Sequence, residues 1–444
     1  MDLAGQGVLV LGLGVSGRSA AIFCAGRGAR VVAADEHPAE QLAGLSELPR
    51  DVELCTGSAF PDPADFDLVV PSPGVPRERY AARARRVWGD IELASRALQI
   101  PIVAVTGTNG KTTTVRLIEA MLREAGMRVQ AAGNLGRPAL SLVGAALDVA
   151  VLEVSSFQLE SVESFRPHVA VILNLSPDHL DRHGSFEVYA ATKARLLEQQ
   201  RGDDYAVLNF DDPTVRKLEE SAEARVISFS RTSGLERGAY LDAGALVLRD
   251  ETGSLHLGLD DLALHGEHNL ENTLAAISSV WALGANPTRA LRALGDFPGL
   301  PHRCETVTTL LGATYVNDSK ATNTGAAIRS LQSFAAPLIW IAGGRDKGLA
   351  FDALAEVATS RVRLALLIGE AAPLLESALS GRVETRRCGS LAEAVRTAAG
   401  IARAGDVVLL SPACASFDQF ESFEDRGGQF RAAVEKLSEG GAAS

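Results

Sequence analysis

Short apolar runs alternate with longer, more polar segments of helical period through most of the chain. The first run, residues 7–12, is continuously apolar and ends in glycine, which is typical of a parallel strand buried on both faces. A helical stretch at residues 16–28 separates it from a second run at residues 30–34, which ends at Asp35. This order of strand, helix and strand predicts an α/β fold with parallel sheets.

The alternation continues to the end of the chain but is interrupted twice. It breaks at residues 94–101, where Pro101 opens a new strand, and again at residues 295–303, where two prolines and two glycines indicate a linker. A more polar stretch at residues 230–262 predicts short β-structure, and HGEHNLENTLAA after it begins a helix. The other predicted strands are residues 67–70, 102–106, 149–154, 169–173, 205–209, 314–317, 338–342, 364–368 and 407–410. We therefore predict three α/β domains, at residues 1–97, 98–298 and 299–444.

Composition narrows the class of protein. The length of 444 residues fits about three domains of ~150 residues each. The net charge of −12 disfavours a nucleic-acid binder, which would need a basic face. No apolar run approaches about 18 residues and residues 1–7 lack a basic region, so we expect neither a membrane span nor a signal peptide. The five cysteines are scattered and never form C-x-x-C, which indicates reduced thiols in a cytosolic protein.

The strongest chemical signal is GTNGKTT at residues 107–113, between a predicted strand and a long predicted helix. The common P-loop pattern requires glycine where this chain has Val105, but the mechanism does not need it. The two glycines allow a tight turn that presents N–H groups, Lys111 can reach terminal phosphates, and the hydroxyl of Thr112 or Thr113 can bind Mg²⁺. A plain glycine turn would leave Lys-Thr-Thr at the helix start unexplained. The candidate ATP contacts are Gly107, Thr108, Asn109, Gly110, Lys111, Thr112 and Thr113.

A second glycine loop, GLGVSG at residues 12–17, follows the first strand, and Asp35 ends the second. Glycines in this spacing with an acidic residue about 20 positions later are typical of a Rossmann nucleotide site. The alternatives are a redox site for NAD and a purely structural turn. Because the chain has its own ATP loop, a nucleotide-bearing substrate is the better interpretation.

Acidic and histidine residues follow two further strands. Glu153 ends the strand at residues 149–154, where P-loop proteins place a carboxylate for Mg²⁺. NLSPDHLDRHGS at residues 174–185 follows the next strand, and one of its side chains is expected to face the metal or the substrate, although each taken singly could be a solvated loop residue. Its candidates are Asp178, His179, Asp181 and His183.

Eight motifs that occur in one order carry a family resemblance. They are GTNGKTT, EVSSFQLE, NLSPDHLDRHGS, YAATK (189–193), HNLEN (268–272), PHR (301–303), NDSKATN (317–323) and SPACASFDQF (411–420). The chain resembles the Mur ligases, the ATP-dependent amide-forming enzymes of peptidoglycan synthesis, over essentially its whole length. NDSKATN, SPACASFDQF and the Rossmann-like first domain are most similar to the members that add D-glutamate.

The resemblance implies a fold, substrates and a reaction. The fold is a Rossmann-like domain for a UDP-substrate, a central P-loop ATPase-like domain with a parallel sheet, and a C-terminal Rossmann-like α/β domain for the amino acid. The implied substrates are ATP, UDP-N-acetylmuramoyl-L-alanine and D-glutamate, with no nucleic acid or membrane partner, and we expect a monomer. A substrate carboxylate attacks the γ-phosphate to give an acyl phosphate, which the amine of D-glutamate then attacks through a tetrahedral intermediate.

The resemblance also implies two Mg²⁺ ions. Thr112 and Glu153 serve one ion and His179 the other, while Lys193 matches the family lysine that is carbamylated by CO₂. An ammonium group would repel Mg²⁺, whereas a carbamate is an anionic oxygen ligand suited to it. An unmodified Lys193 in a helix ion pair is the alternative. The implied catalytic residues are Lys111, His179 and Lys193, and the metal ligands are Thr112, Glu153, His179 and Lys193.

The remaining implied contacts fall into three sets. For ATP, Asn269 matches the adenine contact, Arg303 a phosphate contact and Asp318 the ribose contact. The implied D-glutamate contacts are Lys320, Thr322, Lys347, Ser416 and Phe417. The implied UDP-substrate contacts are Leu13, Val15, Ser16, Asp35, Ser72, Gly74 and Asn134. Only six of the 43 basic residues are lysine, and four of them lie in these motifs, which favours a chemical use over codon bias.

Two other hypotheses compete with this interpretation. The chain could be another amino-acid ligase of the same superfamily, such as a folylpolyglutamate synthetase or a neighbouring Mur member. It could also be a nucleotide-binding regulatory or NAD-sensing protein without catalysis. The Rossmann-like first domain and NDSKATN disfavour the first, and the intact set of Lys111, Glu153, His179 and Lys193 disfavours the second.

Overall fold

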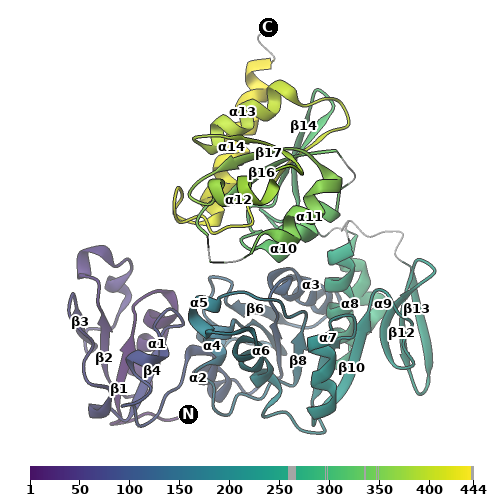
Figure 1. Cartoon of the computed structure of the whole chain (residues 1–444). Helices are drawn as coiled ribbons and strands as arrows, with labels where there is room; N and C mark the ends of the chain where they lie inside the picture. Colours follow the sequence, from purple (N-terminus) through teal and green to yellow (C-terminus); the bar gives the residue numbers. More distant parts are fainter. Residues whose placement is uncertain are drawn as a thin grey trace. The chain divides into compact units, whose positions relative to one another are not determined.

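A computed structural model describes residues 1–258, 267–295, 297, 299–334, 337–346, 348 and 350–441 (Figure 1). The chain divides near residue 297 into two compact units, and each is described separately. Among the helices of these ranges, none combines the length and the apolar character needed to cross a bilayer.

A four-stranded parallel sheet opens the first unit, in the purple part of Figure 1. Its strand order is β3-β2-β1-β4, and helix α1 connects β1 to β2. The central strand β1 is buried along almost its full length, as its apolar sequence predicts. The bounds are β1 Gly7–Leu11, α1 Val15–Ala25, β2 Arg30–Asp35, β3 Glu53–Thr56 and β4 Leu68–Pro71.

A nine-stranded sheet with the order β13-β12-β11-β10-β9-β8-β5-β7-β6 forms the rest of the first unit. It is parallel from β6 to β11, and β12 and β13 add antiparallel hairpins within the predicted polar β-region. The strands are β5 Ile102–Thr106, β6 Val129–Gly133, β7 Val149–Glu153, β8 Val169–Ile172, β9 Tyr205–Asn209, β10 Arg225–Ser230, β11 Gly238–Asp242, β12 Ala245–Asp250 and β13 Gly253–Gly258. The helices are α2 Asp90–Ala97, α3 Lys111–Glu124, α4 Ser156–Leu159, α5 Leu180–His183, α6 Phe186–Ala194, α7 Pro213–Arg216, α8 Glu267–Ala282 and α9 Pro287–Leu291.

The second unit contains a six-stranded sheet with the order β14-β15-β19-β16-β17-β18, parallel except for β14. Side chains of β16 pack on both faces of this sheet. Trp340 lies on the face covered by α10, α11 and α12, and Ile341 lies on the face covered by α13 and α14. The strands are β14 Glu305–Leu310, β15 Ala313–Asn317, β16 Leu338–Gly343, β17 Val362–Ile368, β18 Glu384–Arg387 and β19 Val407–Leu410. The helices are α10 Thr324–Gln332, α11 Asp352–Arg361, α12 Ala372–Leu379, α13 Leu391–Ile401 and α14 Phe423–Gly441.

Helix α2 joins the two sheets of the first unit through buried carboxylates. Glu92 is fully buried and accepts hydrogen bonds from Glu163 N (2.9 Å), Ser164 N (3.1 Å), Ser164 Oγ (2.6 Å) and Arg96 Nε (2.6 Å). Asp90, also buried, accepts from the side chain of Gln158 (3.1 Å) on α4 and is hydrogen-bonded to the side chain of Ser16 on α1, beside the first sheet. A buried carboxylate is stable only when its oxygens are paired in this way, so these bonds hold the two sheets together.

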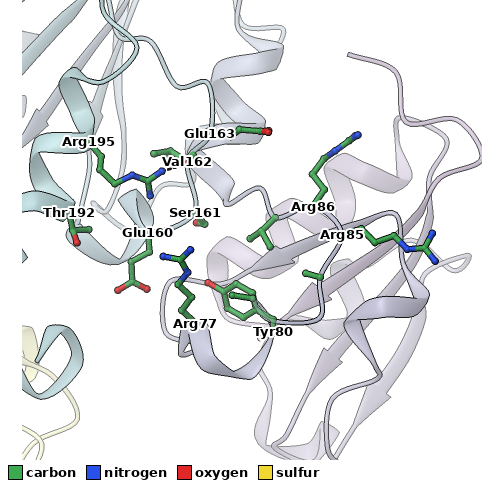
Figure 2. Close-up of a pocket in the computed structure, with 13 residues that line it drawn as sticks. Arg77, Tyr80, Arg85, Arg86, Glu160, Ser161, Val162, Glu163, Thr192 and Arg195 are labelled. Carbon is green, nitrogen blue, oxygen red and sulfur yellow. Dashed lines mark hydrogen bonds between the residues drawn. The ribbon is translucent and has the colours of Figure 1, made fainter. Parts of the chain in front are cut away.

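A pocket of about 460 Å³ lies beside this junction (Figure 2). Several of its charged side chains already serve the protein itself: Arg195 Nη2 donates to Val162 O (2.6 Å), and Glu160 pairs with Arg182 (2.6 Å). Figure 2 shows Arg77 pointing toward Tyr80 and Glu160. None of the predicted contact residues lines this pocket, so it is separate from the P-loop.

We expect Glu92→Ala to lower the free energy of unfolding of the first unit by about 2–4 kcal/mol, because it leaves several buried donors without an acceptor. Differential scanning calorimetry would show this as an earlier transition. Glu198→Ala removes only the exposed partner of Arg195 and should change stability by less than about 1 kcal/mol. Equal transitions for the two variants would contradict the role assigned to Glu92.

Candidate active site at the carboxyl edge of the central sheet

The loop between β5 and α3 has the geometry of a phosphate site. Gly110 caps α3 with a φ of 86°, and a Cβ there would lie 2.4 Å from Asn272 Oδ1. Gly107 has a φ of 149° and would place a Cβ 3.0 Å from Leu173 Cβ. Both positions therefore require glycine. Helix α3 begins at Lys111 with no acidic residue in its first turn, so its N–H groups and positive end suit an anion.

Two residues after β8 brace this loop. Asn174 accepts from Asn109 N (2.9 Å) and donates back to Asn109 O (3.2 Å). Thr108 Oγ1 donates to Ser176 O (3.1 Å) and lies 3.0 Å from the hydroxyl of buried Tyr189. The sequence interpretation did not single out Asn174, Ser176 or Tyr189, although all three lie inside motifs that it quoted.

Two lysine amines converge on one carbonyl of the loop. Gly107 O accepts from Lys111 Nζ (2.8 Å) and from Lys193 Nζ (3.0 Å), and Lys193 also donates to Thr106 Oγ1 (3.2 Å). Lys193 is on α6, is buried, and lies over the ring of Tyr189 (5.0 Å). The two predicted catalytic lysines are therefore neighbours.

The surroundings of Lys193 favour its neutral form. Burial, followed by the charge of Lys111, lowers the pKa of Lys193 well below its usual value, while Asp178 and Glu153 oppose the shift. Only the neutral amine carries the lone pair that can attack CO₂, so this environment suits the expected carbamylation.

Glu153 provides the strongest indication of a metal ligand. It ends β7, where it pairs with Val105 just before the P-loop, and it is buried. Its Oε1 accepts from Asn134 Nδ2 (2.8 Å), whereas its Oε2 is buried without a hydrogen-bond partner among the described residues. A buried carboxylate oxygen in that state fits a hard cation such as Mg²⁺.

The structure separates the four candidates of the loop after β8. Asp178 is buried and acts electrostatically on Lys193, while His179, with a φ of 53°, packs edge-on against Phe157 at 4.9 Å. His183 is buried with Nε2 3.0 Å from Ser156 Oγ, and burial lowers its pKa; Asp181 is exposed. Asp178 and His179 thus remain as candidates for contact with a ligand.

No group of three His, Cys, Asp or Glu side chains in the described ranges is arranged to hold a metal ion. The expected ligand set does not require such a group, because two of its members are the hydroxyl of Thr112 and the modified amine of Lys193. Oxygen atoms of the phosphates and of water would complete the coordination.

Side chains that were predicted to contact the UDP-substrate form hydrogen bonds that hold the glycine loop after β1. Asp35 Oδ2 accepts from Leu13 N (2.7 Å) and Oδ1 from His37 N (3.0 Å); although burial opposes them, these bonds lower the pKa of Asp35. Ser72 Oγ donates to Gly12 O (2.7 Å), and the side chain of Ser16 bonds to Asp90.

The other predicted UDP-substrate contacts differ in exposure and position. Val15 is half exposed and Leu13 is buried. A Cβ added at Gly74 would meet no atom within 4 Å, so this position is open. Asn134 is bonded to Glu153.

In the second unit, predicted contacts lie on loops after β15 and β19. Lys320 Nζ lies 3.5 Å above the ring of Phe423, Ser416 is buried, and Phe417 is 65% exposed. Thr322 N donates to Lys320 O (2.8 Å). Lys347 lies outside the described residues.

The predicted nucleotide contacts are divided between the units. Asn269 lies on α8 in the first unit, and Arg303 and Asp318 lie in the second. Asp318 is buried and accepts from Cys304 N (3.1 Å) and from Ser330; burial raises its pKa to about 6, against these hydrogen bonds. Cys304 has a φ of 46°, so Arg303 is held beside a residue in the left-handed region.

Three family models match the chain in order. They are the Mur ligase MurD-like N-terminal domain at residues 6–88, the Mur ligase middle domain at residues 105–280, and the Mur ligase glutamate ligase domain at residues 302–414. The chain therefore belongs to the Mur ligase family, with three α/β domains as the sequence predicted.

Relatives of similar length share the name of one member of the Mur ligase family. The chain is 41% identical over 450 residues to the UDP-N-acetylmuramoylalanine–D-glutamate ligase of Geotalea daltonii, covering 99% of both chains. It is 43% identical over 451 residues to the ligase of the same name from Geobacter metallireducens, again covering 99% of both.

Solved structures share the fold. A pseudomurein peptide ligase type C from Methanothermus fervidus matches with a TM-score of 0.64 at 18% identity, covering 98% of this chain and 100% of the other. The MurF ligase from Thermotoga maritima in complex with ADP also matches with a TM-score of 0.64 at 18% identity, covering 98% and 96%.

We expect Gly110→Ala to weaken ATP binding roughly tenfold to hundredfold, because a Cβ at this φ adds about 1–3 kcal/mol of strain. Isothermal titration calorimetry would measure the change. Gly202→Ala is the control, since a Cβ at that position meets no atom within 4 Å and the backbone is not left-handed. Unchanged affinity in the Gly110 variant would remove this loop from the nucleotide site.

Proposed function

We propose that this chain is an ATP-dependent ligase that joins UDP-N-acetylmuramoyl-L-alanine to D-glutamate in the synthesis of peptidoglycan precursors, releasing ADP and phosphate. The observation that carries the proposal is the constellation at the end of β5, where Lys111, Lys193 and Glu153 gather around one glycine loop. Full-length identity of about 40% to ligases named for this reaction supports it.

In the first step the carboxylate of the UDP-substrate attacks the γ-phosphate of ATP, giving an acyl phosphate and ADP. Both reactants are anions, so the site must neutralise charge and align the attacking oxygen. Lys111, now folded back onto Gly107 O and Thr108 O, would turn to the phosphates, and the N–H groups of α3 would bind their oxygens.

Mg²⁺ belongs to this proposal. When bound, it would neutralise the phosphate charge, with Thr112 and Glu153 as ligands of one ion and His179 and a carbamate on Lys193 serving the other. The buried, partnerless Glu153 Oε2 and the lowered pKa of Lys193 support this assignment. Asn134, through its bond to Glu153, would fix the other carboxylate oxygen.

In the second step the amine of D-glutamate attacks the acyl carbon. The tetrahedral intermediate then loses phosphate, and the amine loses a proton as the amide forms. Lys320 and the loop at Ser416 and Phe417 are the proposed contacts for the substrate carboxylates, and Thr322 and Lys347 complete the set.

Phosphate release, measured with ATP, the UDP-substrate and one amino acid at a time, tests the function. We expect turnover with D-glutamate and none with L-glutamate, L-alanine or diaminopimelate. Turnover with another amino acid alone would assign a different ligase. Tight NAD binding without turnover would favour a regulatory protein.

Lys111→Ala should lower kcat by about 10²–10³-fold, because the terminal phosphates lose the cation that stabilises the transition state. Lys217→Ala, which removes an exposed surface lysine, should leave kcat unchanged. Near-normal turnover of the Lys111 variant in a steady-state assay would contradict the assigned site.

Lys193→Ala should lower kcat by about 10–100-fold, and added formate or acetate should restore part of the activity by replacing the carbamate oxygens. Lowering the pH should also reduce wild-type activity, since protonation of Lys193 removes the amine that binds CO₂. Kinetics with and without the added anion measure the rescue. Full activity of the variant without any additive would remove Lys193 from the mechanism.

A further inference from the structure

Arg426, near the start of α14, is fully buried. Arginine is rarely buried to this extent unless its charge is paired. In the described part of the chain no carboxylate lies within salt-bridge distance of its guanidinium; Asp418 and Asp318 act on it only electrostatically. Burial lowers its pKa to about 10, which leaves it charged at neutral pH. A cation is thus held inside the second unit by neutral groups.

The N–H groups of the guanidinium donate hydrogen bonds to two loops, mostly to backbone carbonyl oxygens. Nε donates to Ser319 Oγ (3.0 Å) and Nη2 to Ser319 O (2.9 Å), in the loop that follows β15. Nη1 donates to Cys414 O (3.2 Å) and Ala415 O (3.3 Å), in the loop that follows β19. The planar fork of arginine suits several acceptors at once, which a lysine could not reproduce.

A third loop packs against the guanidinium of Arg426. A Cβ at Gly344, directly after β16, would lie 3.2 Å from Arg426 Nη1 and 2.2 Å from Ala415 O, so only glycine fits. Strands β15, β19 and β16 are neighbours and parallel, so their carboxyl ends share one edge of the sheet. Arg426 therefore lies where the three central loops of this edge meet.

These loops carry the proposed amino-acid contacts. Lys320 follows Ser319, and Ser416 follows Ala415. Ser319 Oγ donates in turn to Phe423 O (2.9 Å), and the ring of Phe423 lies under Lys320 Nζ. A shift of the guanidinium would therefore move both loops that carry the proposed amino-acid contacts.

We propose that Arg426 is a positioning residue for the amino-acid substrate: its hydrogen bonds fix the relative placement of the loops at Lys320 and Ser416, and its positive charge, unmatched by a bonded carboxylate, favours a dicarboxylate. The inference rests on the proposed function. It predicts that Arg426 acts on the amino-acid substrate more than on ATP, of whose proposed contacts only Asp318 adjoins a residue bonded to Arg426, and more than on the UDP-substrate, whose proposed contacts all lie in the first unit.

The test compares KM values for the three substrates in Arg426→Lys and Arg426→Met. We expect the KM for D-glutamate to rise about tenfold or more in Arg426→Met and by a smaller factor in Arg426→Lys, which keeps the charge but loses the fork. The KM for the UDP-substrate should stay within about twofold, and the KM for ATP should rise by a smaller factor than the KM for D-glutamate. Unchanged KM for D-glutamate in both variants would overturn the proposal.

Two further variants separate positioning from simple destabilisation. Val434→Ala removes buried volume beneath the same helix and leaves every hydrogen bond of Arg426 in place, so it should lower Tm but leave the KM for D-glutamate unchanged. Ser319→Ala keeps Arg426 and removes one acceptor, so it should raise that KM moderately even if the Arg426 variants fail to fold. If Val434→Ala raises it as much as Arg426→Lys does, or if Ser319→Ala leaves it at the wild-type value, the proposal is wrong.

The wild-type protein is assayed first with D-glutamate and with the other amino acids. A failure of the proposed function appears there, as absent turnover with D-glutamate. A failure of the role of Arg426 appears only in the variants, with wild-type turnover intact.

Discussion

Two lysine amines donate to a single carbonyl oxygen, Gly107 O, and this crowding governs the chemistry of the site. Two unit charges about 4 Å apart repel by about 4 kcal/mol when the effective dielectric constant is near 20. The protein relieves that repulsion at Lys193, which is the more buried of the two. Converting this amine to an anionic carbamate would turn repulsion into attraction, both toward Lys111 and toward a divalent cation.

The sheet topology explains why these groups meet. Strand β5 lies between β7 and β8, and all three are parallel, so the P-loop, Glu153 and the loop at Asp178 leave the sheet at one edge. Helix α6 then carries Lys193 back under the P-loop. Residues far apart in the sequence thus become neighbours because the strands share a direction.

The sequence predicted the parts of the fold that bury apolar runs. β1, β5 and β8 were found because both faces of each are covered, which makes their sequences continuously apolar. Strands β3, β6, β10, β14 and β18 were missed. For β3 and β18 the reason is that Glu53–Thr56 and Glu384–Arg387 are polar strands at sheet edges and carry no such signal.

The sequence predicted those residues of the candidate site that lie in recognisable motifs. Spacing and residue type indicated Lys111 and Glu153, and the family resemblance indicated Lys193. Residue type and spacing alone could not choose among Asp178, His179, Asp181 and His183, because the burial of His183 and its bond to Ser156 depend on packing. Arg426 gave no signal either, since an arginine near the start of a helix is ordinarily a surface residue.

The division of the chain into two units has a consequence for how new specificities arise. All proposed contacts for the UDP-substrate lie in the first unit, whose two sheets are linked through the carboxylates of α2. All proposed contacts for the amino acid lie in the second unit. The P-loop and the proposed amino-acid contacts are thereby encoded in separable stretches of the gene. A lineage can remodel the amino-acid contacts of the later stretch to recruit a different amine, provided that the nucleotide contacts Arg303 and Asp318 in that stretch are kept.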